Sequence, residues 1–297
     1  MTNTLRYTKY GLEGNGLYQG NMDKDACGVG AISNIYGERS HKIIEDGISI
    51  LKNLEHRGAT GSDPKAGDGA GILTQMPHEL FQQVTADEPF DLPDEGEYGV
   101  GMIFMPTGKE SIEKCQKIVN AIIENERQEV LGWRRVPTDN TCLSEFMLDL
   151  EPAVYQVFVK RTTYYVDAFE RRLYVIRRQI EKAIDSSNIE DKGFFYICSF
   201  SAATIVYKGM FLANQLEQYF QDLVDERYES AIALVHQRYS TNTYPTWGLA
   251  QPFRYIAHNG EINTLRGNIN WTRSREAIFE SDYFGADIKK LLPIIVS

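Results

Sequence analysis

The sequence predicts an α+β fold, in which strands cluster and helices lie between the clusters. Runs with strand character follow one another without an intervening helix, so a regular βαβ alternation is not expected. The chain has 297 residues, with 42% hydrophobic and 24% charged residues, an ordinary composition for a globular protein. That length suits one large or two ordinary domains, and no internal repeat divides it.

The charge and the cysteines exclude several classes of protein. A net charge of −10 argues against a nucleic-acid partner, which requires a basic face. No run of 18 apolar residues is present, so no membrane span is expected. The cysteines, Cys27, Cys115, Cys142 and Cys198, form no CxxC pair, which disfavours a metal site or a dithiol redox site. Because residues 1–26 are polar and unlike a signal peptide, we expect a cytoplasmic protein with reduced thiols.

The N-terminal segment and the first strands differ clearly in pattern. Residues 1–26 combine glycines and charges without apolar periodicity, which indicates an extended leader rather than a folded element. Beyond it, short apolar runs predict strands. These runs cover residues 27–35, 71–76, 98–105, 133–137 and 154–160.

A helix is expected between the first two strands. Ser40 is a suitable N-cap, and Ile44, Ile48 and Leu51 recur at helical spacing behind it. This helix should end near His56.

A second helix is expected after Thr107, which forms a capping-box pattern with Glu110. Its apolar face consists of Ile112, Cys115, Val119 and Ile122. We therefore expect Cys115 in the core.

A third helix is predicted over residues 168–184. It carries a basic face formed by Arg171, Arg172, Arg177 and Arg178. Such a face is usually solvated, and we expect the same here.

The remaining pattern predicts mainly strands. Residues 194–207, which contain Cys198, read as one long central strand. Further strands are expected over 231–239, 255–258 and 291–297, with a helix over 266–279.

Cys27 is a candidate nucleophile. Cleavage between Ala26 and Cys27 would place a thiol and a free α-amino group on one residue, which together form a nucleophile and its base. The unperturbed pKa values are about 7.7–8.0 for the amine and about 8.5 for the thiol. On position alone, a small buried core cysteine is the better-supported interpretation.

Two strand ends carry further candidates. Arg238 follows a predicted strand and can present its guanidinium to a carboxylate, although a surface salt bridge alone would explain it. The Asn259 amide and the Gly260 N–H can converge on one oxygen and form an oxyanion hole. An isolated Asn-Gly pair is more simply a turn.

The glycine-rich segment 58–71 suggests a phosphate-binding loop, but the match is weak. It lacks the Walker spacing and the Lys-Ser/Thr that should follow. Gly28 and Gly30 do not continue into a dinucleotide fingerprint either, because residue 33 is Ser33.

Taken together, these motifs and their order resemble class II glutamine amidotransferases, which are N-terminal-nucleophile hydrolases. The longer segments 56–60, 67–71, 238–243 and 265–271 are similar to the glutaminase domain of the glutamate synthase large subunit. The resemblance covers residues 27–297.

The resemblance implies a four-layer αββα sandwich and a set of site residues. Cys27 would attack the side-chain amide of L-glutamine, with its own α-amino group as the base. Asn259 and Gly260 would form the oxyanion hole, and Arg238 would hold the substrate α-carboxylate. The remaining implied substrate-binding residues are Arg57, in a supporting role, and Thr241, in the 239–247 loop that closes over glutamine.

The resemblance also implies a larger enzyme. Residues 1–26 would be a leader removed on maturation, and residues 27–297 a glutaminase domain truncated at its C-terminal side. We expect the acidic residue for the substrate α-amino group beyond Ser297. Flavin mononucleotide (FMN) and an iron–sulfur cluster would lie in downstream synthase domains. Those domains would receive the ammonia and add it to 2-oxoglutarate. A small electron-transfer subunit or ferredoxin would supply electrons.

Two alternatives remain. The chain could belong to another class II amidotransferase, of the phosphoribosyl-pyrophosphate or fructose-6-phosphate type. Those enzymes lack the sequence patterns found here at residues 61–71 and 268–271. It could also be a non-catalytic regulatory module of the same fold. The presence of Cys27, Arg238 and the Asn259-Gly260 pair disfavours that module.

Overall fold

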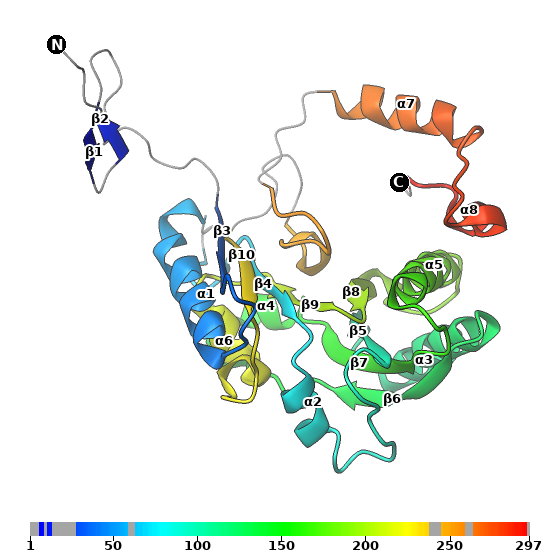
Figure 1. Ribbon diagram of the computed structural model, residues 1–297, viewed down its shortest axis with the longest axis horizontal. Coiled ribbons are helices and arrows are strands. Elements are labelled where there is room, and N and C mark those ends of the chain that lie inside the picture. Colours follow the sequence, from blue (N-terminus) through cyan, green and yellow to red (C-terminus); the bar gives the residue numbers. More distant parts are fainter. Residues whose placement is uncertain are drawn as a thin grey trace.

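The computed structural model describes residues 6–8, 11–13, 28–58, 63–237, 245–258 and 264–295. These residues form two four-stranded antiparallel sheets with helices packed on them (Figure 1). The α+β class predicted from the sequence is confirmed. No described helix combines the length and the hydrophobicity needed to cross a lipid bilayer.

The first sheet has the strand order β3 (Val29–Ser33), β10 (Ile232–Gln237), β4 (Ala70–Gln75), β9 (Thr204–Gly209). Helix α1 (His41–Asn53) packs on it through its predicted apolar face, and Ile44 and Leu51 are fully buried. Ser40 is the N-cap, as predicted, although its side chain makes no capping hydrogen bond.

The second sheet has the order β6 (Glu129–Arg135), β7 (Ala153–Lys160), β5 (Tyr98–Met105), β8 (Tyr196–Ser201). Helices α3 (Lys109–Asn125) and α5 (Val166–Asp185) pack on it, and Cys115 is fully buried there, as predicted. The capping box at Thr107 was wrong. Gly108 is the N-cap, and the Glu110 carboxylate binds Lys114 one turn later.

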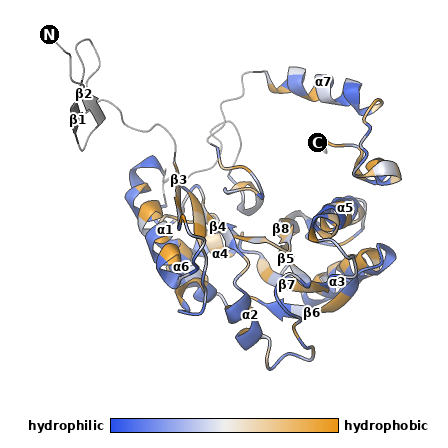
Figure 2. Ribbon diagram, viewed as in Figure 1, coloured by the Kyte–Doolittle hydropathy of each residue, from blue (hydrophilic) through white to orange (hydrophobic). Residues whose placement is uncertain are grey.

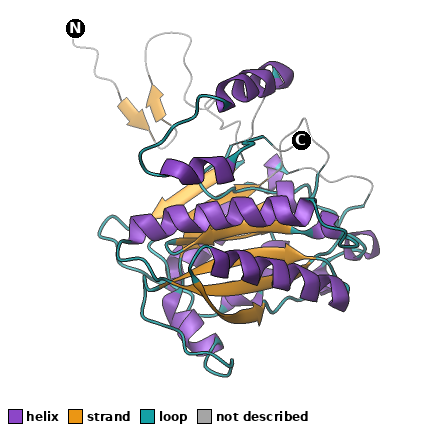
Figure 3. Cartoon of the chain, turned by 90° about the vertical axis from the view of Figure 1, so that its right-hand side faces the viewer, coloured by secondary structure: helices purple, strands orange, loops and turns teal. Residues whose placement is uncertain are grey.

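Alternate residues of β5 enter two different hydrophobic cores. Val100 and Phe104 join a core that includes Ile72 and Val206 of the first sheet, whereas Ile103 joins the core beneath α3 and α5. This is the period-2 alternation of a strand that is buried on both faces. Figure 1 shows the sheets between α1 on one side and α3 and α5 on the other, Figure 2 shows the same view coloured by hydropathy, and Figure 3 shows helices lying in front of the strands.

Short elements complete the described chain, and α7 confirms the helix predicted there. The helices are α2 (His78–Val84), α4 (Glu145–Leu148), α6 (Gln215–Tyr219), α7 (Leu265–Glu276) and α8 (Ile288–Leu291). The 3-10 helices are η1 (Glu55–Arg57), η2 (Asn140–Cys142), η3 (Lys192–Phe194), η4 (Gln221–Val224), η5 (Trp247–Leu249) and η6 (Gly285–Asp287).

Four sequence-based expectations about strands were wrong. Residues 6–8 and 11–13 of the expected extended leader pair as strands β1 (Arg6–Thr8) and β2 (Gly11–Glu13), because a two-residue connection lets near neighbours pair. Residues 255–258 are irregular, with Tyr255 84% exposed and therefore outside any sheet. No strand lies in 291–295, where α8 ends at Leu291.

The fourth concerns residues 194–207, which form two strands in different sheets. The chain leaves β8 and enters β9 at a turn organised by Ser201. The Ser201 hydroxyl donates to Glu170 at 2.9 Å and accepts from the N–H groups of Ala203 and Thr204 at 3.0 and 3.2 Å. Since this turn contains no glycine or proline, its sequence gives no turn signal.

The basic face of α5 is covered rather than solvated, so that prediction was wrong as well. Arg177 and Arg178 are only 8% and 9% exposed. The C-terminal segment lies over them, and Arg178 donates to the carbonyl oxygens of Pro293 and Ile294 at 2.8 and 3.2 Å. Lys182 donates to the Lys290 carbonyl at 2.7 Å. The covering segment is too distant in sequence for a local pattern to reveal it.

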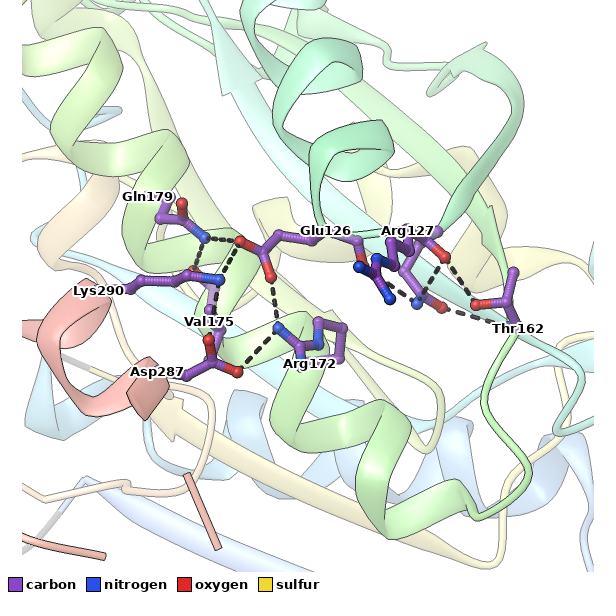
Figure 4. A network of polar contacts seen from close by, with 9 residues as sticks. Glu126, Arg127, Thr162, Arg172, Val175, Gln179, Asp287 and Lys290 are labelled. Atoms are coloured by element: carbon purple, nitrogen blue, oxygen red, sulfur yellow. Dashed lines mark hydrogen bonds and ion pairs between the residues drawn. The ribbon is translucent and has the colours of Figure 1, made fainter. Parts of the chain in front are cut away.

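Glu126 fixes this covering segment to α3 and α5 (Figure 4). Its carboxylate accepts from Gln179 at 2.8 Å and from Lys290 at 2.7 Å, and it also binds Arg172. Asp287 bridges the same two cations, at 3.0 Å from Arg172 and 2.8 Å from Lys290. Burial opposes ionisation of Glu126, but these donors lower its pKa.

A buried network around an ion pair connects the two sheets. The Arg134 guanidinium of β6 donates to both carboxylate oxygens of Asp222 at 2.7 and 2.9 Å, and the two side chains are 7% and 2% exposed. The Tyr207 hydroxyl of β9 donates to Asp222 at 2.7 Å. The amide oxygen of Gln156, in β7, accepts from Arg134 at 2.8 Å.

We expect Asp222→Ala to destabilise the protein by about 3–5 kcal/mol, because the Arg134 charge would remain buried without its partner. Urea unfolding of the 297-residue chain measures this loss. Glu129→Ala is the matched control. It removes the exposed Lys160–Glu129 pair, 48% and 59% exposed, and should cost at most about 1 kcal/mol. Equal losses in the two variants would contradict the structural role of the buried pair.

Candidate active site

One of the predicted site residues, Arg57, lies within the described residues. Cys27, Arg238, Thr241, Asn259 and Gly260 lie outside them. The described neighbours of these positions nevertheless converge on one end of the first sheet. The geometry of those neighbours therefore defines the candidate site.

The start of β3 and the end of β10 meet at this sheet end. The Gln237 N–H donates to the Gly28 carbonyl at 2.6 Å. A Cβ on Gly28 would lie 2.0 Å from the Gln237 carbonyl oxygen, so only glycine fits there. The residue after Cys27 is thus in backbone contact with the residue before Arg238.

The motif that contains Arg57 packs on the same contact. Arg57 ends η1, directly after α1. Its Cβ lies 3.6 Å from the position that a Gly28 Cβ would take. A Cβ on Gly58 would lie 2.5 Å from the side-chain nitrogen of Gln237. The residue Gln237 is only 1% exposed. Arg57 is therefore brought next to the start of β3, and the supporting role predicted for it stays a prediction.

The glycines of segment 67–71 serve close packing. A Cβ on Gly67 would lie 2.1 Å from the backbone of Phe211, and one on Gly71 would lie 2.6 Å from the Gln251 carbonyl oxygen. Gly69 has φ of +135°, which disfavours any other residue. These contacts account for the glycines without a phosphate ligand.

Gln251 fixes the residue that precedes Asn259. Its side-chain oxygen accepts from the His258 N–H at 2.7 Å, and its side-chain nitrogen donates to the His258 carbonyl. Gln251 is itself 2% exposed. Because Gly71 lies beneath Gln251 and pairs with His236 of β10, His258 is tied to the same sheet end.

Lys208 is a buried ammonium group that sequence reasoning missed. It is fully buried in β9, and its Nζ donates to the Gly248 and Ala250 carbonyl oxygens, each at 2.8 Å. Nζ also lies 4.5 Å from the ring centre of Tyr196 and 4.6 Å from that of Phe253. Burial lowers its pKa. The available signal was a lysine in an otherwise apolar strand.

The Lys208 contacts restrain the segment between Trp247 and His258. This segment joins the end of the predicted substrate loop 239–247 to the predicted oxyanion pair. Lys208 holds its first part, and Gln251 holds its last part. A cavity of about 570 Å³ borders the same segment and is lined partly by Tyr196, Pro245 and Trp247.

Comparison with known proteins identifies the family. The family model described as "Glutamine amidotransferases class-II" matches residues 27–297, beginning at the candidate nucleophile. The chain belongs to this family.

The amidotransferase chain is similar to parts of much longer proteins. It is 45% identical over 282 residues to the glutamate synthase [NADPH] large chain of Bacillus subtilis, covering 94% of this chain and 18% of that protein. It is 43% identical over 291 residues to glutamate synthase [NADH] of Saccharomyces cerevisiae, covering 94% and 13%. For the ferredoxin-dependent glutamate synthase of Pyropia yezoensis the identity is 42% over 272 residues, covering 92% and 18%. The amidotransferase chain thus spans less than a fifth of these relatives.

We expect Lys208→Met to loosen the 247–258 segment while the sheets stay intact, because the two carbonyl oxygens lose their shared donor. Backbone amides of residues 248–258 should exchange hydrogen about tenfold faster, while those of β5 and β7 stay protected. Hydrogen–deuterium exchange with mass spectrometry measures both regions. Lys52→Met, which removes a surface ion pair with Glu217, is the matched control. Unchanged exchange over 248–258 would exclude the proposed restraint.

Proposed function

We propose that this chain is the glutaminase part of a glutamate synthase, and that it hydrolyses L-glutamine to glutamate and ammonia through a thioester on Cys27. The match of the family model from residue 27 carries this proposal. The similarity to three kinds of glutamate synthase supports it further.

The chemistry requires Cys27 to be the first residue of the mature chain. Its α-amino group then takes the thiol proton, and the sulfur attacks the side-chain carbonyl carbon of glutamine. The tetrahedral oxyanion accepts hydrogen bonds from the Asn259 amide and the Gly260 N–H. The α-ammonium group returns the proton to the leaving nitrogen, and ammonia departs. Water then attacks the thioester, releases glutamate and restores the thiol.

Substrate binding divides between two further positions. Arg238 pairs with the α-carboxylate of glutamine, since a guanidinium matches a carboxylate in geometry and charge. Thr241 lies in the loop over residues 239–247 that closes on the substrate. Arg57 supports the nucleophile, and its position beside Gly28 agrees with this role.

The proposed enzyme matures by cleavage and has the fold of the N-terminal-nucleophile hydrolases. Residues 1–26 form a leader that is removed, and residues 27–297 form a four-layer αββα sandwich of the N-terminal-nucleophile hydrolase type. The two described sheets, with α1 on one and α3 and α5 on the other, support this arrangement.

The wider reaction belongs to domains beyond this segment. We place the protein in the cytoplasm and assign FMN and an iron–sulfur cluster to downstream synthase domains, with no cofactor in residues 27–297. Ammonia passes to those domains and reacts there with 2-oxoglutarate. The names of the relatives include NADPH, NADH and ferredoxin, which supports a small electron-transfer subunit or ferredoxin as partner.

Two variants of the complete enzyme test the proposal together. Asn259→Ala should lower the glutaminase kcat by about 10²–10³, since it removes one oxyanion donor. Arg238→Ala should mainly raise KM for glutamine, because it removes the carboxylate partner. Steady-state ammonia release measures both constants. Normal turnover in Asn259→Ala, or an unchanged KM in Arg238→Ala, would remove that residue from the site.

A further inference from the structure

A cluster of three arginines lines a cavity away from the sheet end described above. Arg177 and Arg178 lie on α5, and Arg254 lies in the segment that leads to His258. The cavity has a volume of about 280 Å³, and among the described residues Glu181 is the only carboxylate that lines it.

The positive charges outnumber the carboxylate. Glu181 accepts from Arg177 at 2.5 Å and from Arg178 at 2.7 Å, with the two guanidinium groups on its separate oxygens. Arg254 donates to the Ile197 carbonyl at 2.7 Å, which supplies no formal charge. Three guanidinium groups therefore share one carboxylate around this cavity.

The surroundings offset this excess only in part. Glu170 borders Arg177 and Arg254 on their other side, but it accepts from Ser201 and from the Ala202 N–H, and burial raises its pKa. Lys182 adds another cation near Arg178, and Glu276 adds a carboxylate near Lys182. Like charges held together at low exposure are unfavourable unless a counter-charge is supplied.

Two guanidinium groups are held in place by aromatic rings. Arg254 lies 5.9 Å from the ring centre of Tyr196, and Arg177 lies 5.1 Å from that of Tyr174. Stacking of this kind orients a guanidinium and leaves its in-plane N–H groups available to an anion. The cluster is therefore preorganised.

We propose that this cavity binds the carboxylate group of a small molecule with an aliphatic stem. The guanidinium groups of Arg177 and Arg254 supply N–H donors, and Arg178, whose terminal nitrogens already bind Glu181, Pro293 and Ile294, adds charge. Phe195, Tyr196 and Ile197 line the same cavity and provide apolar surface for the stem. A bare inorganic anion would leave that surface without a partner.

Occupancy would also act on the segment 252–258. A ligand that bridges Arg254 to α5 fixes the chain just before His258, which Gln251 already holds. If Asn259 and Gly260 form the oxyanion hole, as the proposed function requires, the ligand would stabilise that hole. The binding site itself does not depend on the proposed function.

Calorimetry on the complete enzyme, with glutarate as the probe at constant ionic strength, tests the site. Arg254→Met should weaken one class of glutarate site by about tenfold or more, since it removes charged hydrogen bonds. Arg171→Met is the control, because Arg171 lies on the same helix but packs on Tyr283, away from the cavity. Arg238→Ala, which removes the proposed carboxylate anchor of the active site, should leave this class of site intact and so separates the two sites.

A wild-type measurement covers the case in which Arg254→Met fails to fold. Glutarate should protect Arg254 from modification by phenylglyoxal, with peptide mass spectrometry as the readout, and should leave Arg171 unprotected. Unchanged glutarate affinity in Arg254→Met, or no protection of Arg254, would overturn the site. Equal affinity for inorganic phosphate would overturn the assignment to carboxylates with an aliphatic stem.

Discussion

The backbone contact between Gly28 and Gln237 is the constraint on which the candidate site depends. Antiparallel pairing of β3 with β10 makes the start of one strand meet the end of the other. The contact is so close that a side chain at residue 28 would strike the Gln237 carbonyl. Residues 27 and 238, the proposed nucleophile and the proposed carboxylate anchor, are the next along the chain from the two residues of this contact. The proposed chemistry at Cys27 therefore depends on this strand pairing.

Buried charged groups fix the segments that regular secondary structure leaves loose. Lys208 restrains the segment that starts at Trp247, and Asp222, which binds Arg134 of β6 and Tyr207 of β9, joins the two sheets. Glu126 holds α8 against α5 (Figure 4). Each burial costs desolvation free energy, which several hydrogen bonds offset in every case. These groups therefore position loops and termini, in addition to any contribution to stability.

Local sequence patterns predicted much of the fold but not its long-range contacts. The apolar spacing around Ile44 and Cys115 located α1 and α3 correctly, because the residues of one helix face lie three or four positions apart in the sequence. The basic face of α5 was misjudged because its cover, residues 288–294, is remote in sequence. The break between β8 and β9 was missed because Ser201 makes the turn through its side chain. The site residues were predicted from sequence motifs that resemble a known family. The described neighbours of those residues supply the geometry around them.

The identity of the first residue tests the central claim most directly. Intact-mass measurement of the mature, active enzyme, combined with N-terminal peptide sequencing, reports it. The account predicts a chain that begins at Cys27, because only then does the thiol have a free α-amino group as its base. A fully active enzyme that still begins at Met1 would contradict the account, since the nitrogen of Cys27 would then be a peptide nitrogen and could not act as a base.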